Sequence, residues 1–180
     1  MKHGLLAVLL VACATSVSSG ENSVQEKIED AVLPLPAAYR DGAEVFSYDA
    51  AWTRTVLRKG TNSVRCQAPG SATLAPHHVA DCFHESLEPA IVRGKQLRAQ
   101  GMETDEARKT LFAEIGEGKV AGPIGGAVGF NMSQSGLVTM NVYAPGATAE
   151  STGLFTKRDA NEPWLMLAGT PMAHVMIPGK

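Results

Sequence analysis

Residues 63–89 read SVRCQAPGSATLAPHHVADCFHESLEP, and their pattern indicates strands followed by a helix. Within them, SVRCQ at 63–67 and HVADCF at 78–83 have the composition of short β-strands. The segment ends in Ser-Leu-Glu-Pro, which is typical of a helix start. Serine can cap the first free N–H groups, and proline in the first turn costs no hydrogen bond. The sequence therefore predicts two strands followed directly by a helix.

Another strand is predicted upstream, at residues 54–57 (RTVL). Between it and 63–67, Lys-Gly-Thr-Asn at 59–62 supplies turn residues, so we expect these two strands to form a hairpin. Residues 32–45 contain two prolines and an Asp-Gly pair, which are typical of a loop.

Two consecutive helices are expected after the strands. Ser86 would cap the first, which ends at Gly101, and Thr104 would cap the second, which stops at Gly116 and Gly118. Apolar side chains recur at helical spacing in both segments. They are Leu87, Ala90, Ile91 and Leu97 in the first helix and Ala107, Leu111, Phe112 and Ile115 in the second.

The last third of the chain has strand-like segments at 125–132, 137–145 and 172–178, with a turn at 131–136. A long polar loop at 145–163 follows the second of them, and loops of this length in compact domains are often functional. The order of strands, helices and strands predicts an α+β fold. We expect a mostly antiparallel sheet packed against two consecutive helices in a single domain.

The N-terminus has the layout of a secretory signal: a basic start, an apolar run at 5–14 and then small residues. The run is shorter than the roughly 20 residues that a membrane span needs. Cleavage could follow the Ala-Cys-Ala at 12–14 or one of the residues Ser18 to Gly20. It could also precede Cys13, which would then carry a lipid. We therefore expect an exported protein, either periplasmic or secreted, or alternatively lipid-anchored at the cell envelope.

These features divide the chain into three parts. Residues 1–20 would be the signal peptide (or 1–12 a lipoprotein signal), 21–42 a polar, proline-containing lead-in, and 43–180 the α+β domain. The net charge is -2 and the Lys and Arg residues are scattered, so no basic patch argues for a nucleic-acid partner.

Cys66 and Cys82 are the two cysteines that remain after removal of the signal. In an exported protein such a pair predicts a disulfide. A thiol nucleophile or a thiolate ligand is the alternative. The chain has no Cys-x-x-Cys motif, so a redox dithiol is not expected.

His77, His78 and His84 cluster around Cys82 and raise the question of a metal site. On an extended strand, alternation puts His78, Cys82 and His84 on one face and His77 on the other. At a rise of about 3.3 Å per residue, His78 would lie ~13 Å from Cys82, too far to share one ion. We therefore predict no metal and no cofactor. His84, just before the helix start, is the histidine of this cluster that we expect to face a functional site.

His174 is the other candidate. Alternation puts Met172, His174 and Met176 on one face, and thioethers beside an imidazole suit copper(I). A buried core is the simpler interpretation, because the intervening residues are also apolar and methionine is a common core residue. Acid–base catalysis by His174 is a third interpretation.

The chain contains no nucleophile motif of the G-x-S-x-G or S-x-x-K type. Ser151 and Thr152, in the polar loop, are the remaining hydroxyl candidates. A small-molecule enzyme would combine Ser151 with His84 or His174 as the acid or base.

Four segments resemble an uncharacterised family of exported bacterial proteins. They are VLRKGTNSVRC (56–66), CFHESLEP (82–89), ATAESTGL (147–154) and EPWLMLAGTPMAH (162–174). The resemblance implies that these segments belong to one fold. It implies no activity, cofactor or partner.

The leading hypothesis is a binding or structural module of the cell envelope. Its pocket or surface would be formed by the 145–163 loop, the segment around Trp164, and His84. The partner would be a small molecule or an envelope protein. A small-molecule enzyme and a Met/His copper-binding protein are the alternatives.

Overall fold

The computed structural model describes residues 23–179, so the expected signal peptide and Cys13 lie outside the described residues. The helices are α1 (Val24–Ala31), α2 (Ala37–Arg40), the 3₁₀ turn η1 (Glu85–Leu87), α3 (Glu88–Ala99), α4 (Thr104–Gly116) and α5 (Ala149–Thr152). The strands are β1 (Glu44–Tyr48), β2 (Arg54–Arg58), β3 (Val64–Gln67), β4 (His78–His84), β5 (Val128–Ser133), β6 (Val138–Tyr143), β7 (Trp164–Met166) and β8 (His174–Ile177). Within this part of the chain, no helix has the length and apolar character that crossing a membrane requires.

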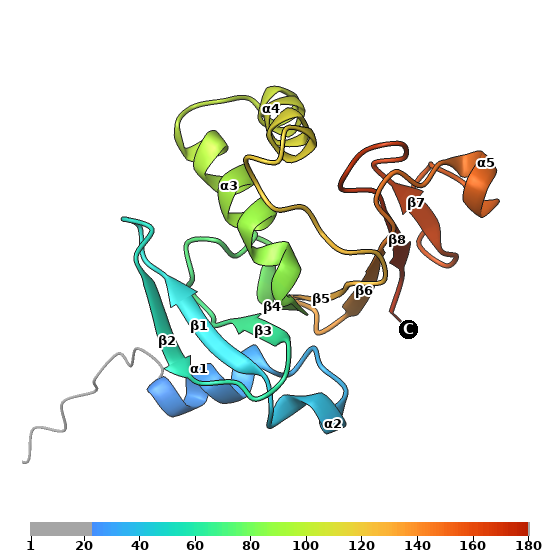
Figure 1. Cartoon of the computed structure of the whole chain (residues 1–180). Helices are drawn as coiled ribbons and strands as arrows, with labels where there is room; N and C mark the ends of the chain where they lie inside the picture. Colours follow the sequence, from blue (N-terminus) through green and yellow to red (C-terminus); the bar gives the residue numbers. More distant parts are fainter. Residues whose placement is uncertain (1–22, 180) are drawn as a thin grey trace, which may run out of the picture.

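All eight strands belong to one sheet, in the order β2-β1-β3-β4-β5-β6-β8-β7. Neighbouring strands are antiparallel except β1 and β3, which run parallel. The helices α3 and α4 pack together over the β1–β4 half of the sheet, whereas β6, β8 and β7 extend to the side (Figure 1). The predicted α+β fold, with a mostly antiparallel sheet and two consecutive helices, is confirmed.

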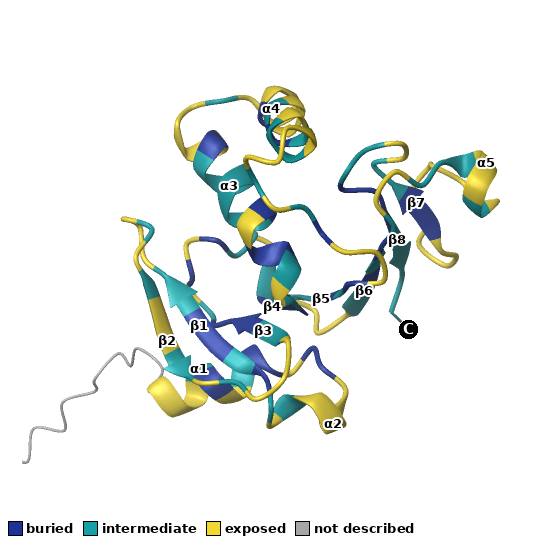
Figure 2. Ribbon diagram, viewed as in Figure 1, coloured by how far each residue is buried: buried dark blue, intermediate teal, exposed yellow. Residues whose placement is uncertain are grey.

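Alternation along the strands divides the buried side chains into two clusters. Phe46 of β1 faces α3 and α4 and meets the ring of Phe83 edge to face, with ring centroids 6.1 Å apart. Its neighbour Val45 faces α1 on the opposite side of the sheet. The strands β1 and β3 therefore each contain buried residues and no exposed one (Figure 2).

The predicted disulfide between Cys66 and Cys82 is present. These residues are direct partners across β3 and β4, and they share a buried cluster with Ile28 and Ala31 of α1. The bond therefore lies in the core between the sheet and α1. The helix α1 belongs to the N-terminal segment 21–42, which was expected to be a polar lead-in, and it packs against the sheet.

The predicted hairpin between 54–57 and 63–67 is wrong. The strand β2 pairs with β1, and β3 pairs with the other edge of β1 in the parallel direction. Part of β1 falls within the predicted loop at 32–45. Its second and third residues, Val45 and Phe46, are fully buried. Packing against both helical layers therefore forms a strand where the local sequence favours a turn.

The residues that form the turns around β1 also differ from the prediction. Asp49 closes the β1–β2 hairpin, because its Oδ1 accepts the backbone N–H groups of Ala51 (2.9 Å) and Thr53 (2.8 Å). The predicted turn at 59–62 instead passes the start of β1, where two of its N–H groups donate to the carbonyl of Gly42.

The starts of the long helices differ slightly from the prediction. Ser86 does not cap α3. Instead, Nδ1 of His84 accepts the Ser86 N–H (3.2 Å) at the start of η1, which leads into α3. Thr104 is the first residue of α4, after Glu103, and it makes no capping hydrogen bond. The short elements α5 and β7, within and just after the long polar loop, were not predicted.

Candidate functional site

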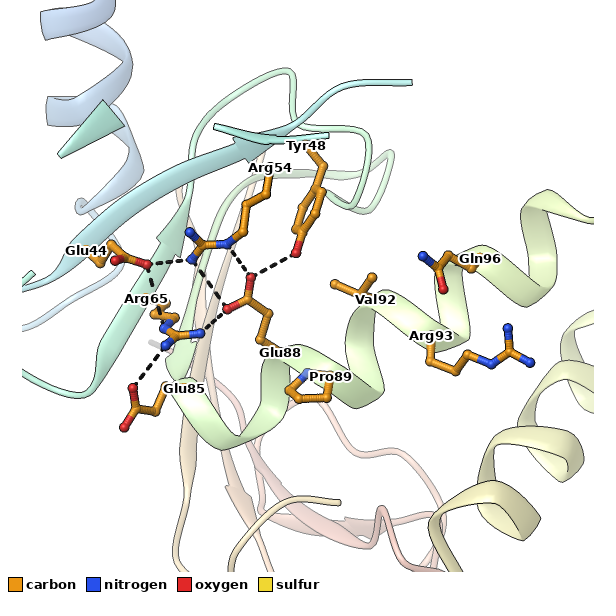
Figure 3. A pocket seen from close by; sticks show the side chains of 10 residues that line it. All are labelled: Glu44, Tyr48, Arg54, Arg65, Glu85, Glu88, Pro89, Val92, Arg93 and Gln96. Atoms are coloured by element: carbon orange, nitrogen blue, oxygen red, sulfur yellow. Dashed lines mark hydrogen bonds and ion pairs between the residues drawn. The ribbon is translucent and has the colours of Figure 1, made fainter. Parts of the chain in front are cut away.

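The first candidate site is a cavity of about 510 Å³ where α3 meets the β1–β2 edge (Figure 3). Glu88, in the first turn of α3, lies at its centre. Its carboxylate accepts hydrogen bonds from Nε of Arg54 (2.6 Å) and the hydroxyl of Tyr48 (3.0 Å), and it contacts Arg65. Arg54 also pairs with Glu44 at 2.5 Å. We call these five residues the Glu88 network.

The pKa values follow from these contacts. Burial raises the pKa of Glu88, but hydrogen bonds from Arg54 and Arg65 outweigh burial and bring it below its ordinary value. Burial, and then the charge of Glu88, raise the pKa of Tyr48 to about 12. Because carboxylates engage both guanidinium groups, we interpret this cavity as the contact that docks α3 on the sheet. The sequence indicated Glu88 only as part of the helix start in Ser-Leu-Glu-Pro, and not as a partner of two arginines from the sheet.

The second candidate site is a groove of about 570 Å³, which we call the sheet groove. Its polar side chains come from β4, the turn before it, and the β5–β6 hairpin: His77, His78, Asn131, Ser133 and Thr139. Its apolar side chains are Leu137, Trp164, Met166 and Met176. Thr156 and Arg158 of the long loop complete it. Thus the expected loop and Trp164 do line one cavity.

A bulge in β4 brings His78 into the sheet groove. The register shifts between His78 and Ala80, so that His78 pairs with Ser133 while Ala80 pairs with the adjacent Met132. In a regular strand without a bulge, the present sequence would point His78 and Asp81 to opposite faces, since they are three positions apart. With it, Nδ1 of His78 lies 2.7 Å from Oδ1 of Asp81. The expectation that His78 shares a face with Cys82 is therefore corrected.

A chain of polar side chains continues from Asp81. Nδ2 of Asn131 donates to Asp81 (2.7 Å), and Nδ2 of Asn141 donates to Oδ1 of Asn131 (2.5 Å). An ionised carboxylate only accepts, so it fixes the orientation of the Asn131 amide, which in turn fixes that of Asn141. We call His78, Asp81, Asn131 and Asn141 the polar chain.

Both ends of the polar chain lack a hydrogen-bond partner. Oδ1 of Asn141 and Nδ1 of His78 are the buried side-chain polar atoms without a partner among residues 23–179. Nδ1 of His78 is close to Asp81, but the contact is not aligned as a hydrogen bond. Asn141 is only 8% exposed. Such atoms are uncommon and cost about 1–3 kcal/mol each. His78 lines the sheet groove, whereas Asn141 is not among the residues that line it.

The charge of Asp81 also affects the pKa values of Tyr143, at the end of β6, and of Lys95, on α3. Burial, and then the Asp81 charge, raise the pKa of Tyr143 to about 12. Burial and the nearby Arg98 lower the pKa of Lys95, and Asp81 opposes them. Asp81 is therefore a largely buried charge that influences groups on two sides of the polar chain.

The two histidines proposed as catalytic lie apart. His84 alternates with Phe83, so it is on the α1 face of the sheet, and its Nδ1 caps η1. His174 is on β8, and β5 and β6 lie between the two strands. At roughly 4.8 Å per strand this separates them by about 14 Å. His174 is buried against Tyr143, and its Nδ1 bonds to the carbonyl of Met172 at 2.8 Å.

The remaining candidates are also placed apart. The hydroxyl of Ser151 takes part in the capping box of α5, accepting the N–H of Thr148 and donating to its carbonyl. Met172 packs in the cluster with α3 and α4, whereas Met176 lines the sheet groove. Within residues 23–179, no three His, Cys, Asp or Glu side chains are grouped closely enough to hold a metal ion.

The comparisons with known proteins give no family assignment: no family model, curated protein or solved structure matches the chain. Evidence for a function must therefore come from the residues of the site itself.

Proposed function

We propose that the protein is a binding module and that the sheet groove takes a small organic ligand. The observation that carries this proposal is the part of the polar chain that lines the groove, namely His78 and Asn131. Hydrogen bonds between its members hold the amide groups in place before a ligand arrives. The groove volume of about 570 Å³ is within the range of small-molecule sites.

The composition of the groove supports the same proposal. Polar groups from β4–β6 face apolar side chains such as Trp164 and Met176, a combination typical of sites that bind and orient an organic molecule. In the Glu88 network, by contrast, the charged groups already pair with one another.

The test is a nuclear magnetic resonance (NMR) screen of the disulfide-bonded protein against a library of small neutral and charged organic compounds. We expect binders to shift the side-chain amide signals of Asn131 and Asn141 and the indole signal of Trp164. The indole of Trp52, in the β1–β2 turn, is the internal control. If every binder shifts only signals around Glu88, or if no compound binds, the proposal is wrong.

We also propose that the protein is exported. The signal-like N-terminus supports this, and the Cys66–Cys82 disulfide is typical of proteins in oxidising compartments. Lipid anchoring through Cys13 is the alternative form. Mass spectrometry of the processed protein distinguishes them, because the lipidated form begins at Cys13 and is heavier by its acyl chains. A processed protein that keeps Met1 would count against export.

A further inference from the structure

A second cavity, of about 230 Å³, lies between α3 and α4 and shares no lining residue with the sheet groove. Its lining residues recur every three or four positions along each helix, so each helix presents one face to the cavity. They are Ile91, Gly94, Lys95 and Arg98 of α3 and Thr104, Ala107, Arg108 and Leu111 of α4. Ala90 and Met172 complete the lining.

The inner part of this cavity is apolar. Ala90, Ala107, Leu111 and Met172 all belong to the buried cluster that α3 and α4 form with the sheet. Gly94 has no side chain, and a Cβ atom at this position would lie 3.4 Å from Cδ2 of Leu111. Gly94 therefore keeps this part of the cavity open, and an apolar group of a ligand can contact the floor.

The outer part of the cavity is cationic. Lys95, Arg98 and Arg108 line it, and no acidic side chain does. Arg98 and Arg108 are exposed and Lys95 is partly buried, so the cations lie where the cavity opens to solvent. A ligand in the cavity can therefore reach the side chains that set its charge preference.

Two of these three cations have no carboxylate partner. Arg108 pairs with Asp105 at 3.2 Å in an exposed contact. Lys95 and Arg98, by contrast, form no ion pair with any of residues 23–179. Both are thus available to an anionic ligand.

The charge of Lys95 is unfavourable in the empty cavity. Burial, and then the like charge of Arg98 on the same helix face, lower the pKa of Lys95, and Asp81 opposes them only in part. An anion beside Lys95 and Arg98 would offset both effects, because an opposite charge favours the charged form of the lysine. The cavity therefore combines a preference for negative charge at its opening with a preference for apolar groups at its floor.

We propose that the cavity between α3 and α4 binds a small organic monocarboxylate, with the carboxylate on Lys95 and Arg98 and the apolar body on Leu111 and Met172. A guanidinium matches the two oxygens of a carboxylate, and two unpaired cations suit one negative charge better than the two of a phosphate. The cavity is smaller than the range of about 300–1,000 Å³ for drug-sized ligands, which favours a body of roughly six carbons. This site is independent of the sheet groove.

NMR titration of the disulfide-bonded protein with sodium hexanoate tests the proposal. We expect hexanoate to shift the Met172 methyl signal to saturation with a Kd of about 1 mM, and to raise the pKa of Lys95 in the complex. The Trp164 indole, in the sheet groove, should not change. The control ligands are 1-hexanol without a charge, hexylamine with the opposite charge, and inorganic phosphate without an apolar body. Each should bind about tenfold more weakly or worse.

Variants test whether the cations of the cavity make the contact. Lys95→Met keeps a long side chain without the charge and should weaken hexanoate binding about tenfold or more. Lys109→Met is the matched control: Lys109 is an exposed lysine of α4 outside the cavity, and its loss changes the net charge equally. Arg98→Gln, at an exposed position, repeats the test with little risk to folding. Backbone amide spectra and melting temperatures verify that the variants fold.

The other outcomes each overturn a stated part of the proposal. Equal affinity for hexanol or hexylamine would remove the role of the cations, and equal affinity for phosphate would remove that of the apolar floor. Hexanoate binding that neither Lys95→Met nor Arg98→Gln weakens would place the ligand elsewhere. If hexanoate does not bind, or shifts only signals of the sheet groove, the proposal is wrong, and the function proposed for the sheet groove stands or falls by its own screen.

Discussion

Glu88 shows how one side chain can connect two layers of the protein. It is only 6% exposed, and its partners Arg54, Arg65 and Tyr48 come from the sheet. A buried carboxylate of this kind is favourable only with its partners in place, and removing one member leaves the others uncompensated.

We predict that Glu88→Gln lowers the free energy of unfolding by about 2 kcal/mol. This is below the full range for breaking a buried pair, because both arginines are partly exposed. Urea unfolding at neutral pH measures it. The matched control is Glu85→Gln, which removes a half-exposed partner of Arg65 and should cost at most about 0.5 kcal/mol. Equal losses in the two variants would contradict the docking role of Glu88.

We predict that the free energy of unfolding depends on pH through His174. Burial lowers its pKa from the ordinary value of 6.5, although the hydrogen bond to Met172 opposes burial. The unfolded chain therefore binds a proton at a higher pH than the folded protein does. Stability from this residue is complete above about pH 6.5 and is lost as the pH falls toward the folded value.

We expect the free energy of unfolding to fall between pH 7 and pH 5, and His174→Gln to flatten this dependence. Urea unfolding across this range measures the slope for both proteins. Gln100→Ala is the control, because it removes an exposed side chain that does not titrate, and it should keep the wild-type slope. An unchanged slope in His174→Gln would sink the assignment.

Among the elements, those with strong local signals were predictable. The spacing of Leu97, Ala107 and Leu111 indicated α3 and α4, and all three are buried. The pairing of β1 was not predictable, because it depends on burial of Val45 and Phe46 by segments distant in sequence. The candidate site depends on the same kind of non-local information. Nothing in the local sequence shows that a bulge turns His78 toward Asp81, or that Asn131 and Asn141 meet on adjacent strands.

The role of the bulge in β4 can be tested by deleting one residue of this strand. Deleting Val79 removes the extra residue and leaves His78 two positions before Asp81, so β4 should become a regular strand with His78 still opposite Ser133 and on the Asp81 face. Cys82 and the rest of β4 should keep their register. A crystal structure of the variant gives the answer, with Val79→Ala, which keeps the bulge, as the control. If His78 moves to the opposite face after the deletion, Val79 is not the extra residue of β4.

In the molecule as a whole, the two halves of the sheet differ in how far helices cover them. The β1–β4 half carries α1 on one face and α3 with α4 on the other, and it contains the disulfide. The β5–β8 half leaves part of one face open as the sheet groove. The helical layers thus stabilise one half, and the extended strands of the other provide the proposed binding surface.

The disulfide should therefore matter for the stability of the whole domain. It closes a loop whose ends are 16 positions apart, and the loop-entropy model gives about 3 kcal/mol for such a loop. We predict that reduction lowers the free energy of unfolding by about this amount, as measured by urea unfolding with and without a reductant. The double variant Cys66→Ala/Cys82→Ala should start from the lower stability and be insensitive to the reductant. A wild-type protein that is equally stable in both conditions would show that packing between α1 and the sheet holds this half together without the bond.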